Sequence, residues 1–128
     1  MCEVEYLIVV DTDGAVTSRN LQGNVSIIQS SCCTLMEKEV SGELVTTCKP
    51  GQLVKWKAVP KSPDSVVEIL GFKGQMVSDV CKPTQKRRFS EVWEGMVNEN
   101  SNGIFSYSID IVFDGIWMSL NPRMKVSV

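Results

Sequence analysis

Apolar and polar residues alternate along much of this chain with a period of two, which is the pattern of a strand that buries one face. The clearest case is residues 104–113, IFSYSIDIVF, where Ser106, Ser108 and Asp110 point away from an apolar face. That face carries Phe105, Tyr107, Ile109, Ile111 and Phe113. The pattern predicts one strand over this stretch.

A second strand with clean alternation is expected near residues 53–59. Val54, Trp56 and Ala58 share one of its faces and Lys55 and Lys57 share the other, so we expect the lysine face to be exposed. Shorter or weaker strand patterns occur at residues 3–10, 24–28, 44–48, 65–72, 90–99, 116–120 and 124–128. Residues 30–43, SSCCTLMEKEVSGE, are interpreted as an irregular loop.

Turn residues separate these strands, and no stretch shows the pattern of an amphipathic helix of several turns. Pro50-Gly51, residues 60–65 and Asp114-Gly115 are such turns, and the last is typical of a hairpin. The sequence therefore predicts an all-β fold, an antiparallel Greek-key β-sandwich with a cupredoxin-like strand order. With 128 residues, we expect one domain over residues 1–128.

The charges nearly cancel, with 13 Lys and Arg against 15 Asp and Glu, which argues against nucleic acid as a partner. No apolar run is long enough to span a membrane. The first residues include Glu3 and Glu5, where a secretory signal would carry basic residues, so we expect no signal peptide and a cytoplasmic location. The basic cluster KPTQKRR, residues 82–88, is interpreted as a solvated loop.

The cysteine and histidine content limits the catalytic and metal sites that the chain can form. The chain has 5 cysteines and no histidine, which excludes Ser-His and Cys-His catalysis and metal sites that need imidazole. The cysteines are Cys2, Cys32, Cys33, Cys48 and Cys81. Their spacing contains no CxxC pair, so we expect reduced, packed thiols, with a Cys48–Cys81 disulfide as the alternative. A blue-copper site is excluded as well, and we expect no cofactor.

The stretch YLIVVDTDGAV, residues 6–16, has the order of the nucleophile motif of haloacid-dehalogenase-like phosphatases. In that interpretation Asp11 would be the nucleophile and Asp13 the acid/base, and Asp110 and Asp114 show a spacing that those enzymes use. The helices of an α/β sheet are missing from the pattern, however, and Ala15 follows the glycine. A strand that runs into a turn is therefore favoured; Asp11 and Asp13 remain weak candidates for a calcium site.

Four segments in order resemble the AidA/PixA family of small bacterial proteins: YLIVVDTDGAV, LQGNVSII, residues 42–76 from GELVTTCKPGQL onward, and residues 92–126 that end in NPRMKV. The family usually has Asp in place of Asn121. The resemblance implies an autoinducer-regulated or inclusion-body-forming protein, often linked with quorum sensing, host interaction and virulence. It implies no catalytic residues.

We therefore expect a non-enzymatic protein that acts by binding or self-assembly, with a homodimer as the simplest form. The short segment MKVSV, residues 124–128, is expected to lie at a sheet edge where a second copy can pair. The alternative is a lectin-like or small-ligand-binding sandwich, with Trp117 and loop carboxylates facing an unknown protein or carbohydrate. Packing in or near the core is nevertheless favoured for all three tryptophans, Trp56, Trp93 and Trp117, and a phosphatase is the remote alternative.

Overall fold

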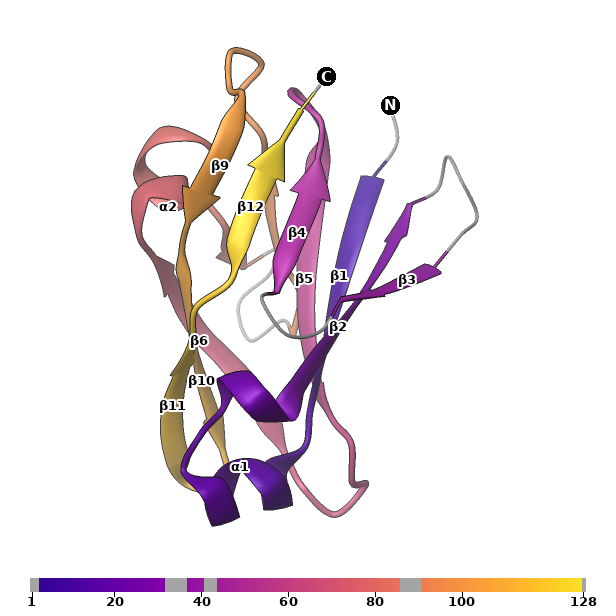
Figure 1. Cartoon of the computed structure of the whole chain (residues 1–128), viewed down its shortest axis with the longest axis vertical. Coiled ribbons are helices and arrows are strands. Elements are labelled where there is room, and N and C mark those ends of the chain that lie inside the picture. Colours follow the sequence, from indigo (N-terminus) through magenta and orange to yellow (C-terminus); the bar gives the residue numbers. More distant parts are fainter. Residues whose placement is uncertain (1–2, 32–36, 41–43, 86–90, 128) are drawn as a thin grey trace.

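Two layers of β-structure face each other around a shared apolar core (Figure 1). The structure is a computed structural model of the chain and describes residues 3–31, 37–40, 44–85 and 91–127. One layer is a sheet with the strand order β3-β2-β1-β5-β8-β7, and the other consists of two shorter sheets with the orders β11-β10-β6 and β4-β12-β9. The all-β class expected from the sequence is confirmed.

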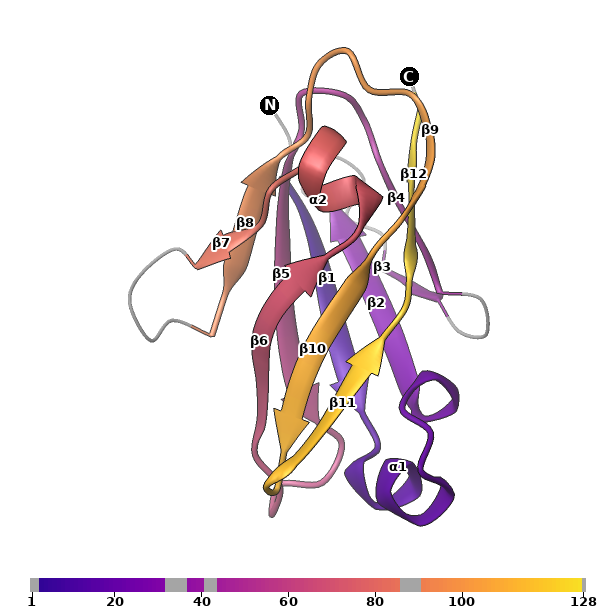
Figure 2. The same ribbon diagram turned by 90° about the vertical axis from the view of Figure 1, so that its left-hand side faces the viewer.

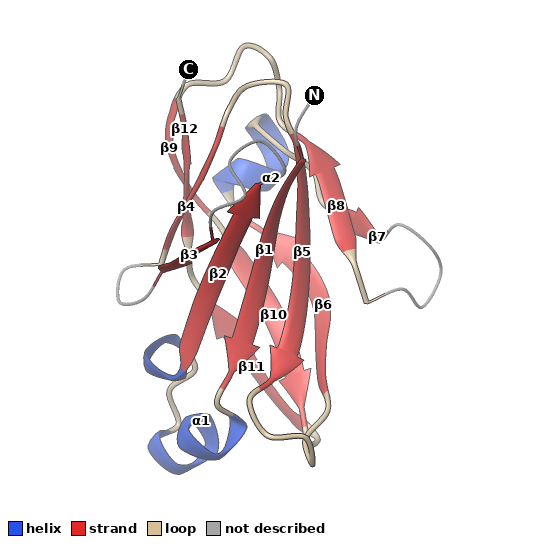
Figure 3. Cartoon of the chain, turned by 90° about the vertical axis from the view of Figure 1, so that its right-hand side faces the viewer, coloured by secondary structure: helices blue, strands red, loops and turns tan. Residues whose placement is uncertain are grey.

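The larger sheet contains the long N-terminal strand and its neighbours (Figure 3). Its strands are β1 (Glu3–Val10), β2 (Val25–Ser31), β3 (Glu37–Val40), β5 (Leu53–Pro60), β7 (Thr84–Gln85) and β8 (Trp93–Met96). The smaller sheets contain β4 (Val45–Cys48), β6 (Val67–Lys73), β9 (Gly103–Ser106), β10 (Ser108–Phe113), β11 (Ile116–Leu120) and β12 (Arg123–Val126).

The alternation read from the sequence places the core residues correctly. Along β5, Val54, Trp56 and Ala58 are buried while Lys57 is exposed. In the facing layer, Ile109, Ile111 and Phe113 of β10 are buried against them. Burial of these apolar side chains from two layers is the main source of stability that such a sandwich has.

Residues 104–113 form two strands rather than one. The chain leaves the β9–β12 pairing at Tyr107 and continues as β10 in the other small sheet, as the continuous ribbon in Figure 2 shows. Tyr107 is buried at this junction. The alternation expected over this stretch is retained, because Tyr107 and the β10 residues named above all face the core.

Two strand pairs are parallel, where the sequence predicted antiparallel strands throughout. β1 pairs with β5 and β4 pairs with β12 in this way, while the other pairs are antiparallel. The segment 37–40, which was expected to be loop, pairs with β2 as strand β3. Period and composition reveal strands but not their partners, so pairing direction was outside the reach of the pattern.

The C-terminal strand β12 lies in the middle of its sheet, between β4 and β9, so the prediction that MKVSV forms an edge is wrong. The strand with Lys55 and Lys57 is also internal, between β1 and β8. Its lysines pair with carboxylates: Lys55 Nζ lies 3.0 Å from Glu3 and Lys57 Nζ lies 3.7 Å from Glu91.

Helical structure is confined to short segments in the described part of the chain. They are α1 (Thr12–Ser18), the 3-10 turn η1 (Gln22–Asn24) and α2 (Gln75–Asp79). The stretch DTDGA, expected to be a turn, starts helix α1 instead. Asp11 caps the N-terminus of this helix, so the polar residues after β1 begin a helix where a turn was expected.

One side of the sandwich is closed by side chains that reach across from β1 and β2 to β4. Tyr6 and Gln29 are opposite one another on these strands, and the Tyr6 hydroxyl donates to the carbonyl of Thr47. Gln29 Oε1 accepts from the Thr47 N–H at 3.2 Å and Gln29 Nε2 donates to Thr47 Oγ1 at 2.8 Å. These contacts satisfy backbone groups on the side of β4 that has no strand partner among the described residues.

Candidate functional site

The two aspartates proposed for calcium or catalysis lie at the start of α1. Asp11 Oδ1 accepts a hydrogen bond from the backbone N–H of Gly14 at 3.1 Å, so its carboxylate acts as the helix cap. Asp13 is exposed in the first helical turn, where a negative charge interacts favourably with the helix dipole. Among the described residues, no group of His, Cys, Asp and Glu side chains is arranged to hold a metal ion.

Asp110 and Asp114, the other pair of the phosphatase interpretation, occupy the positions predicted for them in a strand and a hairpin turn. Asp114 and Gly115 both have positive φ, 50° and 79°, as a tight hairpin turn between β10 and β11 requires. Asp114 accepts hydrogen bonds from Ser65 Oγ at 3.0 Å and from the Val66 N–H at 3.4 Å. The carboxylate therefore ties this turn to the β5–β6 loop.

The described cysteines are buried thiols. Cys48 and Cys81 are free, so the alternative of a disulfide between them is not observed, and Cys2, Cys32 and Cys33 lie outside the described residues. Burial raises the pKa of Cys48 to about 11 and that of Cys81 to about 12. Because the thiolate is the nucleophile, these groups are poorly suited to catalysis.

A network of aromatic and hydroxyl groups lies in the core beside these thiols. The Tyr107 hydroxyl lies 3.1 Å from Thr46 Oγ1 and accepts from Trp56 Nε1 at 3.4 Å. The Trp56 ring contacts Tyr6 and Phe72, with centroids 5.7 Å and 5.0 Å away. All the polar atoms here are satisfied within the protein, so we interpret the network as structural.

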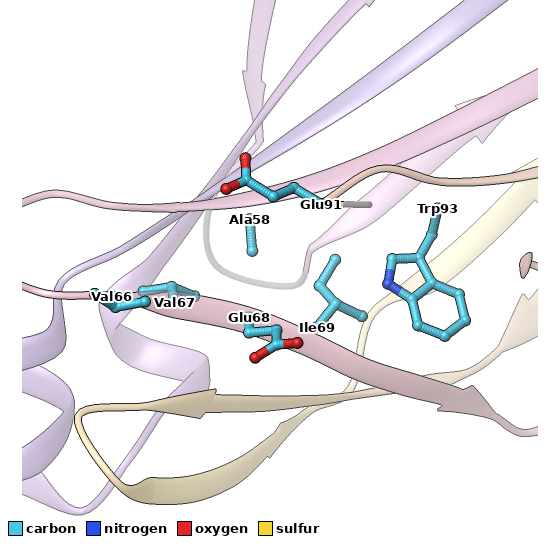
Figure 4. A pocket seen from close by; sticks show the side chains of 7 residues that line it. All are labelled: Ala58, Val66, Val67, Glu68, Ile69, Glu91 and Trp93. Carbon is cyan, nitrogen blue, oxygen red and sulfur yellow. The ribbon is translucent and has the colours of Figure 1, made fainter. Parts of the chain in front are cut away.

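A small groove lies on the side of the sandwich opposite the Thr47 contacts. It has a volume of about 180 Å³ and is lined by Ala58, Val66, Val67, Glu68, Ile69, Glu91 and Trp93. Figure 4 shows Trp93 at one end, Val66 and Val67 at the other, and Glu68 and Glu91 on opposite sides. Its lining combines five apolar or aromatic side chains with the carboxylates of Glu68 and Glu91, and Glu91 is already paired with Lys57.

The other candidate surface is the outward face of β6, β10 and β11, which we call the small-sheet face. It consists of Glu68, Leu70, Lys73, Ser108, Asp110, Val112, Trp117 and Ser119. Trp117 is 58% exposed and Leu70 is 48% exposed, which is unusual for large apolar side chains. Val66, at the start of β6, is more exposed still.

Polar contacts hold the centre of the small-sheet face in place. Asp110 is buried there, accepts from Ser119 Oγ at 2.7 Å, and lies 3.3 Å from Lys73 Nζ. The same ammonium group lies 5.9 Å from the centroid of the Trp117 ring. The exposed Trp117 ring of β11 therefore lies next to the Lys73–Asp110 ion pair.

Strand β11 forms the edge of this sheet. It pairs with β10 on one side, and no strand pairs with its other side within the part of the chain that the structure describes (Figure 2). Its sequence, IWMSL, contains neither a charged residue nor a proline. Charged residues and prolines are the features with which proteins normally prevent an edge from pairing with another chain, so β11 lacks this protection.

The structure brings together only some of the residues that the sequence singled out. Trp117 is exposed, as one alternative required and contrary to the packing favoured for it, whereas Trp56 is buried and Trp93 is half-buried, as expected. The Trp117 ring is connected through Lys73 to the carboxylate of Asp110. The sequence pattern did not single out Lys73 and Leu70, because only the pairing of β6 with β10 places them on the small-sheet face. Of the basic cluster, Lys82 is exposed and residues 86–88 lie outside the described residues.

In the described residues, no helix has the length and apolar character needed to cross a membrane. The fold is a β-sandwich similar to that of PixA. The crystal structure of the inclusion body protein PixA from Burkholderia cenocepacia matches with a TM-score of 0.74 at 11% identity, over 98% of this chain and 95% of that one. The resemblance to PixA expected from the sequence is therefore confirmed at the level of the fold.

The chain belongs to a family described as a domain of unknown function (DUF8788), whose model matches residues 2–119. No curated protein matches the sequence. An endo-fucoidan hydrolase of glycoside hydrolase family 107 matches with a TM-score of 0.39 at 7% identity, over 80% of this chain and 18% of that one. A cysteine protease inhibitor from Entamoeba histolytica matches with a TM-score of 0.35 at 14% identity, over 66% and 85%. Both scores are too low to support an argument.

Proposed function

We propose that the protein is a non-enzymatic PixA-like protein that acts by self-assembly. The observation that carries this proposal is the exposed side chain of Trp117 on β11, a sheet edge that has no charged residue. A monomer that works alone gains nothing from an exposed tryptophan next to an open edge, whereas an interface gains buried apolar area from it.

Two further observations support the proposal. Three of the four carboxylates that suggested a phosphatase are engaged: Asp11 as a helix cap, Asp114 in a turn contact and Asp110 in an ion pair. The fold is shared with a protein that is described as an inclusion body protein, and such a body requires copies to associate. A homodimer is the smallest assembly that this surface can form.

Static light scattering across a concentration series tests the proposal. We expect the apparent mass to rise from that of one chain, 14.2 kDa, towards twice that value as concentration increases. Association should weaken when a mild denaturant is added but change little with ionic strength, because the edge strand β11 has no charged residue. A mass that stays at one chain at every concentration would contradict the proposal.

In this proposal the protein remains in the cytoplasm and accumulates with cell density, in keeping with the resemblance to autoinducer-regulated AidA proteins. A link with host interaction would follow from that regulation rather than from a catalytic activity. Quantifying the protein in cultures sampled at increasing density, with and without spent medium, tests this regulation. A constant level per cell would contradict it.

The groove lined by Trp93 favours a second candidate function, the binding of a small ligand. Its mixed lining, with two carboxylates beside apolar side chains, suits a small organic cation better than an anion. A thermal-shift panel of small amines and matched carboxylic acids tests this candidate, because a ligand that binds only the folded chain raises the melting temperature. If neither the amines nor the carboxylic acids raise the melting temperature, the binding of such a ligand is excluded.

A further inference from the structure

The edges of the described sheets differ in how well they are protected. Strand β7 has only two residues, and β3 has the charged sequence EKEV. β6 carries Glu68 and Lys73 and has an irregular register opposite Asp110 and Ile111. The backbone of β4 is engaged by Tyr6 and Gln29, and α2 packs beside β9 (Figure 1). Strand β11 has none of these protections.

From this difference we infer that a second copy of the chain pairs with β11, antiparallel and about a two-fold axis. The inference rests on the proposed function, self-assembly, and specifies where that assembly occurs. Pairing would join the two β6-β10-β11 sheets into one continuous sheet across the two copies. The unpaired backbone groups of each β11 would then be satisfied by the same groups of its copy.

The length of the strand favours one register. Alignment of all five residues of β11 with their copies places Met118 on the two-fold axis. Trp117 then lies opposite Ser119 of the second copy, and both belong to the outward face. Because diagonal neighbours on one face are within reach of aromatic side chains, the two Trp117 rings contact each other across the axis.

The inward face of β11 gives independent support. Ile116 and Met118 pack against the core but are only partly buried, whereas Leu120 is fully buried. In the inferred register, Met118 meets its own copy across the axis, whereas Leu120 is already buried and gains no further contact. Pairing would therefore cover apolar side chains that the edge leaves partly exposed, which stabilises the pair by removing that area from water.

Charge is compatible with this arrangement. Strand β11 has no charged residue, so two copies bring no like charges opposite each other at the axis. The nearest charges of the small-sheet face, Lys73 and Asp110, form an ion pair and lie on β6 and β10. Copies that paired along β6 would instead bring Glu68 and Lys73 into the new interface.

Hydrogen exchange read by mass spectrometry on the unmodified chain tests the inference. Backbone amides of β11 should exchange more slowly at concentrations where light scattering shows dimers than at dilutions where it shows monomers. The amides of β3 and β7, at the other layer, should show no such dependence. A dimer whose β11 amides exchange at the same rate as in the monomer would overturn the inference and leave self-assembly intact.

The variant Trp117→Lys provides a second readout. We expect it to raise the dimer dissociation constant by about tenfold or more, because two ammonium groups replace two indole rings next to the axis. The matched control is Ile104→Lys, which also replaces an exposed apolar residue but lies on β9. Equal weakening by both variants, or by neither, would overturn the inference, whereas a wild-type chain that is always monomeric would overturn the proposed function itself.

Discussion

At the scale of single residues, the glycine of the phosphatase-like motif has a structural explanation. A Cβ atom at Gly14 would clash with Asn24 Oδ1 and lie 2.8 Å from Asp11 Oδ2. The Asn24 amide is not free to move away, because it donates to Asn20 O at 2.7 Å and to Ser18 Oγ at 2.9 Å. The order Asp-x-Asp-Gly therefore reflects a helix cap that is packed closely against η1, and no catalysis is needed to explain it.

This packing predicts the effect of Gly14→Ala. Alanine normally favours a helix over glycine, but here we expect the free energy of unfolding to fall by about 1–3 kcal/mol because of the clash. Thr17→Ala, in the exposed part of the same helix, is the control and should change stability by less than about 0.5 kcal/mol. Urea unfolding measures both changes, and a stabilising Gly14→Ala would show that the Asn24 contact is not rigid.

Asp11 gives a related prediction that separates a cap from a metal or catalytic site. Asp11→Asn keeps an oxygen that accepts from the Gly14 N–H, so we expect a stability change of under about 1 kcal/mol. Asp11→Ala removes the acceptor and should cost about 1 kcal/mol. If Ca²⁺ raises the melting temperature of the parent chain but not of Asp11→Asn, the carboxylate has a role in metal binding that the cap does not explain.

At the scale of elements, the sequence revealed most strands but not their neighbours. Residues 3–10 and 116–120 form strands with the bounds expected, because long alternating or apolar runs are strong local signals. The position of β12 between β4 and β9 depends on pairing with distant segments, which no local pattern records. Helix α1 was missed because seven residues with a glycine inside show too little of a helical period.

The contacts between β2 and β4 lead to a prediction at this scale. Gln29→Ala leaves the Thr47 N–H without its side-chain acceptor, so we expect the free energy of unfolding to fall by about 1–3 kcal/mol. Ser26→Ala, three residues earlier on β2, is the control and should be nearly neutral. Denaturant unfolding of both variants checks this, and equal effects would show that the contact with β4 contributes little.

At the scale of the whole molecule, the sequence predicted the sandwich and its core better than its surface. Period two assigns side chains to two faces, and apolar faces must meet, so residues such as Trp56 and Phe113 could be placed inside. The small-sheet face could not be predicted in the same way. Its members come from β6, β10 and β11, and only the observed register shows that Lys73, Asp110 and Trp117 are neighbours.

The core also predicts how the whole molecule responds to alkaline pH. The chain has 2 tyrosines, Tyr6 and Tyr107, and both are buried. Burial raises the pKa of Tyr6 well above its usual value of 10.0 and that of Tyr107 to about 12. The buried thiols of Cys48 and Cys81 shift in the same direction, so the folded state keeps protons that the unfolded chain releases.

The sign of the resulting pH dependence follows from these shifts. Below the unfolded pKa values, near 9 for the thiols and 10 for the phenols, both states hold these protons and the stability contributed by the groups is complete. Each group lowers stability by about 1.4 kcal/mol per pH unit only between its unfolded and its folded pKa, which is from about 9 to about 11 for Cys48, from about 9 to about 12 for Cys81 and from about 10 to about 12 for Tyr107. We expect phenolate absorbance at alkaline pH to appear together with the loss of β-structure, which circular dichroism measures. The variant Tyr6→Phe should halve the amplitude of the phenolate absorbance, because one of the 2 tyrosines is removed. Phenolate absorbance that develops while the circular dichroism remains native would show that these tyrosines are accessible in the folded sandwich.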